Sequence, residues 1–120
     1  MSRARQRLGE RGEGAALEFL QKQNYQLLHR NLRRRDGEVD LILRDRDTLV
    51  FCEVKTQRFA DATLAYSPKQ QSRMRRMVLA YLAKSGWEGP VRVDLLAVDG
   101  DPAEEGYTLH HFQDILSDNS

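Results

Sequence analysis

Apolar residues recur at helical spacing near the start of the chain. Within residues 14–23 they fall on one side of a helix, at Ala16, Leu17, Phe19 and Leu20. This spacing predicts an amphipathic helix with one buried stripe. Glycines at positions 9, 12 and 14 weaken any earlier start, because glycine disfavours helix interiors.

A second helix is predicted over residues 69–85. Ser67 is placed as its N-cap, Pro68 suits its first position, and Gly86 suits its end. The apolar positions that give this segment its helical spacing are Met74, Met77, Val78, Tyr81 and Leu82.

Five segments have the composition of strands. They cover residues 25–31, 38–43, 48–56, 91–98 and 107–112. The predicted order is therefore αβββαββ. Large apolar residues occupy both faces of the second and third strands, so both faces of the sheet should be covered. The pattern predicts an α/β fold in which helices flank a mixed sheet.

One strand carries charges where apolar side chains are expected. The segment VFCEVKT, residues 50–56, contains Glu53 and Lys55. Side chains alternate along a strand, so these two point to the same face. Burying such a pair is costly unless each charge is paired or holds an ion.

A second carboxylate, Asp40, is expected beside Glu53. If Arg46 and Asp47 form a two-residue hairpin loop, Asp45 pairs with Thr48 and Asp40 lies opposite Glu53. A register shifted by two residues keeps both carboxylates on one face. A shift by one separates them, and the apolar pattern alone does not exclude it.

Two adjacent carboxylates suit a hard cation such as Mg²⁺ or Mn²⁺, with water completing its shell. A nearby lysine can orient or deprotonate an attacking water and stabilise charge that develops on a phosphate. This combination indicates metal-assisted phosphodiester hydrolysis. The alternative is structural: Glu53 and Lys55 form a partly buried ion pair, and Lys55 extends to water.

Charge is distributed unevenly along the chain, although the net charge is +1. Residues 1–35 hold nine Lys or Arg against three Glu, and residues 99–120 hold six acidic residues and no Lys or Arg. The basic end is either a solvated face with a loose tail or a surface that attracts phosphate.

We expect one domain over residues 1–120, with loose tails at 1–8 and 114–120. One cysteine, no signal-peptide core and no membrane-length apolar run favour the cytoplasm.

Four motifs together resemble a known family. They are GERGEGAALEFL, RNLRRRDGEVDLIL, LVFCEVKTQ and SPKQQSRMRRMVLAYL. Asp40 followed by Glu53-Val54-Lys55 is similar to the signature of the PD-(D/E)XK nuclease superfamily. Over residues 8–98 the chain more closely resembles the YraN-like family of small bacterial proteins, which is similar in fold to archaeal Holliday-junction resolvases. The resemblance implies a restriction-endonuclease-like core.

The resemblance also implies roles for individual residues. Asp40 and Glu53 would hold one or two Mg²⁺ or Mn²⁺ ions together with the backbone carbonyl of Val54, and Lys55 would be the catalytic lysine. Glu13 matches a helix glutamate that faces the metal site in related resolvases. Its other interpretation is an acid favoured near a helix N-terminus. Cys52 is interpreted as a small core residue.

Basic side chains near this site are candidates for contacts with nucleic acid, although each could belong to a solvated face. They are Arg33, Arg34, Arg35, Lys69, Arg73 and Arg76.

The leading hypothesis is an endonuclease that acts on branched or otherwise structured DNA. A homodimer is compatible with the two cuts that a junction needs. The alternatives are a nucleic-acid-binding module without chemistry and a protein-interaction domain. Asp94 either supports the site or ends a salt bridge, and no histidine is assigned a chemical role.

Overall fold

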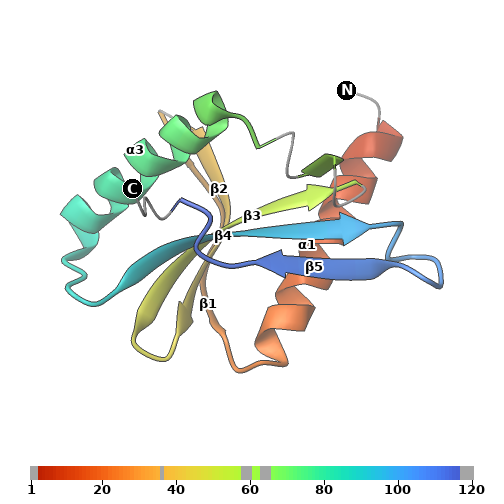
Figure 1. Ribbon diagram of the computed structural model, residues 1–120, viewed down its shortest axis with the longest axis horizontal. Coiled ribbons are helices and arrows are strands. Elements are labelled where there is room, and N and C mark those ends of the chain that lie inside the picture. The colour runs from red at the N-terminus through yellow and green to blue at the C-terminus, as the bar shows by residue number, and fades with distance from the viewer. Residues whose placement is uncertain (1–2, 36, 58–60, 63–65, 117–120) are drawn as a thin grey trace.

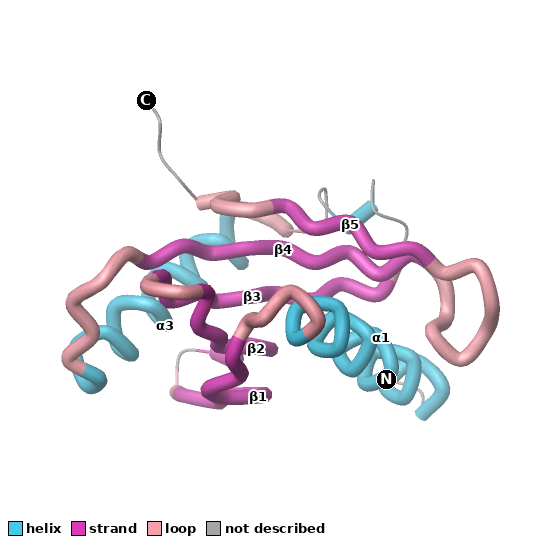
Figure 2. The backbone as a smooth tube through the Cα atoms, turned by 90° about the horizontal axis from the view of Figure 1, so that it is seen from below, coloured by secondary structure: helices cyan, strands magenta, loops and turns pink. Residues whose placement is uncertain are grey.

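Five strands form one sheet in the order β1-β2-β3-β4-β5, with a helix on each face (Figures 1 and 2). The computed structural model describes residues 3–35, 37–57, 61–62 and 66–116. All neighbouring strands are antiparallel except β3 and β4, which run parallel. The elements are α1 (Arg3–Gln21), β1 (Gln26–Arg34), β2 (Gly37–Asp45), β3 (Thr48–Thr56), α3 (Pro68–Ser85), β4 (Val91–Asp99) and β5 (Thr108–Phe112). The α/β class, the αβββαββ order and the mixed sheet are confirmed.

Each helix covers its own apolar cluster, as the apolar residues on both faces of the strands predicted. The cluster under α1 contains Ala16, Leu17, Leu20, Tyr25, Leu41, Leu43, Val50, Cys52, Val54, Leu96 and Val98. The cluster under α3 contains Val39, Ile42, Leu49, Phe51, Met74, Met77 and Val93. Cys52 is fully buried in the first cluster, in agreement with a packing role. None of the helices formed by the described residues is long and apolar enough to cross a membrane.

The first helix begins earlier than its glycines predicted. Residues 3–8, expected in a loose tail, form the first turns of α1. The reason lies in packing, because Gly12 is buried against β3. A Cβ at Gly12 would overlap the hydroxyl of Thr56. The glycine therefore lets the helix approach the end of β3 closely.

Replacement of Gly12 by Ala should destabilise the protein by about 1–3 kcal/mol, because the added methyl group overpacks the contact with Thr56. The matched control is Gly14→Ala in the same helix, where a Cβ would meet nothing within 4 Å. That change should stabilise by up to about 1 kcal/mol through helix propensity. Urea unfolding of the two variants measures both effects, and equal stabilities would contradict the proposed contact.

The end of β1 and the segment after β5 also differ from what the sequence predicted. β1 continues through Arg34, beyond the predicted end at residue 31, so Arg33 and Arg34 lie in the strand. Beyond β5, Ile115 donates a backbone hydrogen bond to the Val93 carbonyl at 2.9 Å and packs against the α3 cluster. Part of the expected acidic tail is therefore packed, whereas residues 117–120 lie outside the described residues.

The termini of α3 are as predicted. The Ser67 hydroxyl accepts a hydrogen bond from the Gln70 backbone N–H at 3.2 Å, and Pro68 follows at the first helical position. Gly86 ends the helix in the left-handed conformation, with φ of 71°. These caps fix the position of the first turn of α3 over the sheet.

Candidate metal centre

The hairpin between β2 and β3 has the predicted register. Asp45 pairs with Thr48, and the pairing continues to Leu41 and Cys52, where it ends. Arg46 has φ of 57°, the left-handed conformation that a tight hairpin loop requires. The next positions in the same register are Asp40 and Glu53. The two carboxylates therefore lie opposite each other at the point where β2 and β3 stop pairing.

Asp40 is held by the backbone of β3. Its Oδ2 accepts a hydrogen bond from the Val54 N–H at 2.8 Å, in place of a ladder bond from β2. In a strand the N–H and C=O of one residue point to the same side. The Val54 carbonyl is therefore directed toward the side of β3 on which Asp40 lies. A carbonyl that shares a metal ion with Asp40 must point in this direction.

Glu53 and Lys55 form a partly buried ion pair. Lys55 Nζ lies 3.6 Å from Glu53 Oε1, and the side chains are 21% and 19% exposed. This separation exceeds that of a hydrogen bond. The Glu53 carboxylate oxygens can therefore still bind another partner. The structural alternative describes this ion pair, but it gives one lysine to two neighbouring carboxylates, and Asp40 is otherwise held by the Val54 N–H.

The carboxylates open into a pocket of about 170 Å³ between the sheet and α3. It is lined by Glu38, Asp40, Glu53, Gln70, Arg73 and Met74. Burial and the charge of Asp40 raise the pKa of Glu53 to about 8, although Lys55 opposes the shift. Burial and the charge of Glu38 raise the pKa of Asp40, against the Val54 hydrogen bond. The pocket thus disfavours ionisation of two neighbouring carboxyl groups, and a bound cation would favour it.

Glu13 lies near this pocket but not in it. It lines a neighbouring pocket of about 250 Å³ with Asn31, Arg33 and Glu38, among others. Burial and the charge of Asp40 raise the pKa of Glu13 to about 7, and Arg30 at 4.0 Å opposes the shift. Among the described residues, no three His, Cys, Asp or Glu side chains gather closely enough to hold a metal ion.

The donor set nevertheless fits a magnesium-like ion. Mg²⁺ is usually held by one or two carboxylates and keeps several waters, rather than filling a cage of protein ligands. Asp40 and Glu53 supply two carboxylates, and the Val54 carbonyl supplies a further hard oxygen. We therefore assign these three groups as the candidate ligands, with Glu13 near enough for the charge of Asp40 to raise its pKa.

The stability of the metal-free protein should fall as pH rises from about 5 to about 8.5. The pKa of Glu53 is raised from 4.5 to about 8, so the folded protein holds a proton that the unfolded chain releases. Its stabilisation is complete below the unfolded pKa and lost as pH rises through the folded pKa. Half of the difference between the unfolded and folded pKa values of Glu53 corresponds to roughly 2 kcal/mol of folding free energy. Urea unfolding in EDTA measures the slope, and Glu53→Gln should flatten it; an unchanged slope would contradict the assignment.

The structure brings only some of the predicted basic residues beside the carboxylates. Arg73 lines the pocket, and its side chain packs over Gly37, where a Cβ would lie 2.9 Å from Arg73 Cδ. Arg33 lines the neighbouring pocket and lies 3.6 Å from Glu38. The remaining candidates are exposed and border neither pocket: Arg34, Arg35, Lys69 and Arg76.

Two polar residues of this region, and a third outside it, were missed in the sequence. Glu38 borders both pockets, and Gln70 borders the carboxylate pocket. The third is His111, which bonds with the buried Asp94 at 2.7 Å. Spacing gave a signal for Glu38 alone, because it lies two residues before Asp40 in the same strand. Asp94 proves to belong to a salt-bridge network rather than to the pocket.

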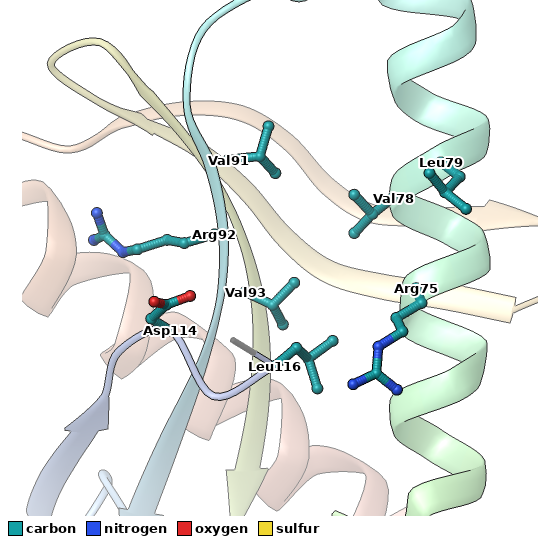
Figure 3. Close-up of a pocket in the computed structure, with 8 residues that line it drawn as sticks. All are labelled: Arg75, Val78, Leu79, Val91, Arg92, Val93, Asp114 and Leu116. Carbon is teal, nitrogen blue, oxygen red and sulfur yellow. The ribbon is translucent and has the colours of Figure 1, made fainter. Parts of the chain in front are cut away.

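A larger pocket, of about 490 Å³, lies between α3 and β4 (Figure 3). Val78 and Leu79 come from the helix, and Val91 and Val93 from the strand. Its charged residues are Arg75, Arg92 and Asp114, and it lacks a pair of carboxylates. The two carboxylates that the sequence singled out as candidate metal ligands line the smaller pocket instead.

Comparison with known proteins places the chain in a family. A model of Uncharacterised protein family UPF0102 matches residues 12–98, which include every residue of the carboxylate pocket. The chain belongs to this family. A UPF0102 protein of Symbiobacterium thermophilum is 43% identical over 100 residues, covering 80% of this chain and 85% of the relative. One of Geobacter sulfurreducens is 41% identical over 95 residues, covering 76% and 74%. The resemblance to the YraN-like family is confirmed.

Proposed function

We propose that the chain is a metal-dependent endonuclease that cleaves branched or otherwise structured DNA in the cytoplasm. The observation that carries this proposal is the pair Asp40 and Glu53, which line one partly buried pocket, with Lys55 Nζ 3.6 Å from Glu53 Oε1. The resemblance of these residues to the PD-(D/E)XK signature adds to it.

Asp40, Glu53 and the Val54 carbonyl would hold the cation. A bound Mg²⁺ or Mn²⁺ supplies positive charge that stabilises the reacting phosphate and lowers the pKa of water. Hydrolysis adds the elements of water across one P–O bond: the hydroxyl joins phosphorus, and a proton goes to the leaving oxygen. Lys55, held 3.6 Å from Glu53, orients the water and stabilises the charge that develops on the phosphate.

Cations beside the pocket would position the DNA backbone. Arg73 lines the pocket together with the two carboxylates, and Arg33 lines the adjoining one. Their guanidinium groups can contact phosphates on either side of the scissile bond. The exposed residues Arg34, Arg35, Lys69 and Arg76 would extend this surface, and a homodimer would supply the two sites that a four-way junction needs.

The test is a cleavage assay on end-labelled four-way junction, flap, duplex and single-stranded DNA with Mg²⁺, Mn²⁺ or EDTA. We expect nicking of the branched substrates that requires the metal. Unreacted samples on a native gel report binding, which should weaken steeply with added salt. Binding without nicking would overturn the enzymatic proposal and favour a nucleic-acid-binding module. The absence of both would favour a protein-interaction domain.

A further inference from the structure

One polar atom in the carboxylate pocket has no partner. Gln70 Oε1 is buried and accepts no hydrogen bond from any described residue. Its side chain lines the same pocket as Asp40 and Glu53. A buried acceptor without a donor costs stability, so such groups in folded proteins call for an explanation.

The position of Gln70 is fixed by the first turn of α3. Its backbone N–H donates to the Ser67 hydroxyl, and the neighbouring Gln71 side chain donates to the Tyr66 carbonyl at 2.9 Å. One turn later, Met74 is buried in the α3 cluster and borders the same pocket. The carboxamide of Gln70 is therefore held on the face of α3 that meets the carboxylates.

The missing partner must be a hydrogen-bond donor, because a carbonyl oxygen only accepts. With a cation bound, Asp40 and Glu53 are deprotonated and cannot supply a hydrogen, and Lys55 pairs with Glu53. A water molecule or a substrate hydroxyl fits the requirement. In phosphoryl transfer, a glutamine amide is an established means of orienting an attacking water.

We propose that Gln70 orients the attacking water, its Oε1 accepting a hydrogen bond from the water whose oxygen attacks phosphorus. This role rests on the proposed hydrolysis and adds α3 as the third element of the site, beside β2 and β3. It also explains why an unpaired acceptor is retained in a pocket where an apolar side chain of similar size would be more stable.

The test compares Gln70→Met with Gln71→Met, the same change one residue along the helix. Gln70→Met should lower kcat for nicking about 10–100-fold with KM and DNA binding unchanged. In EDTA it should raise Tm by a few degrees, because the unpaired acceptor is removed. Gln71→Met should leave nicking unchanged and lower Tm, because it breaks the bond to the Tyr66 carbonyl. Gln70→Glu keeps an acceptor and should recover part of kcat.

Each outcome bears on a different claim. Wild-type kcat in Gln70→Met, beside a loss of nicking in Glu53→Gln, overturns the role of Gln70 and leaves the proposed function standing. A lower Tm of Gln70→Met in EDTA also overturns it, because Gln70 would then have a structural partner such as a buried water. No metal-dependent nicking by the wild-type protein overturns both proposals.

Discussion

Replacement of Glu53 by Gln should lower DNA nicking by at least about 10³-fold while making the metal-free protein more stable. Glutamine keeps the size of the side chain but removes the charge that burial and Asp40 oppose. The repulsion between two neighbouring carboxylates is thereby relieved, and one of the proposed metal ligands is lost. Nicking on four-way junctions and urea unfolding at about pH 9, above the raised pKa of Glu53, measure the two effects.

Two further variants sharpen this experiment. Asp40→Asn should also abolish nicking, and its amide oxygen can still accept from the Val54 N–H, so the fold should survive. Glu88→Gln, at an exposed position between α3 and β4, should leave both nicking and stability unchanged. Glu53→Gln with wild-type nicking would contradict the assignment of the pocket.

Replacement of Asp94 by Ala should cost about 3–5 kcal/mol of folding free energy, a large share of the stability of a small domain. The Asp94 carboxylate is fully buried. It accepts from His111 at 2.7 Å, from the Asp114 backbone N–H at 3.0 Å and from Arg92 at 3.1 Å. Alanine would leave these groups without their partner. Urea unfolding near neutral pH measures the loss.

The hydrogen bonds to Asp94 also predict that the protein loses folding stability in acid. Burial raises the pKa of Asp94, but the hydrogen bonds from His111, the Asp114 N–H and Arg92 outweigh it, so the pKa is lowered. Its stabilisation is present above the unfolded pKa and lost as pH falls through the folded pKa. Asp114→Asn, whose side chain is exposed, is the matched control. An Asp94→Ala protein as stable as this control would contradict the account.

The central geometry of the site could be predicted from the sequence because it depends on local rules. The two-residue loop at Arg46 and Asp47 sets the register, and alternation along the strands then places Asp40 opposite Glu53. The caps of α3 were predictable for the same reason, since Ser67 and Gly86 act on the backbone next to them. These features depend on residues close in sequence.

The features that the sequence did not predict depend on contacts between distant segments. Gly12 lies within a helix because it packs against Thr56, a contact that outweighs the helix propensity of glycine. His111 gave no pattern signal because its partner, Asp94, lies on a different strand. Gln70 carried none either, since a glutamine in the first turn of a helix is usually a surface residue.

The most direct test of the central claim is a calorimetric titration of Mn²⁺ into the wild-type protein and the Glu53→Gln variant at about pH 7.5. We predict Mn²⁺ binding to the wild-type chain that releases protons, because the raised pKa of Glu53 leaves that group partly protonated before the ion binds. The variant should bind at least about tenfold more weakly. Equal affinity in the two proteins, or no binding to the wild-type chain at millimolar Mn²⁺, would contradict the assignment of Asp40 and Glu53 as a metal centre.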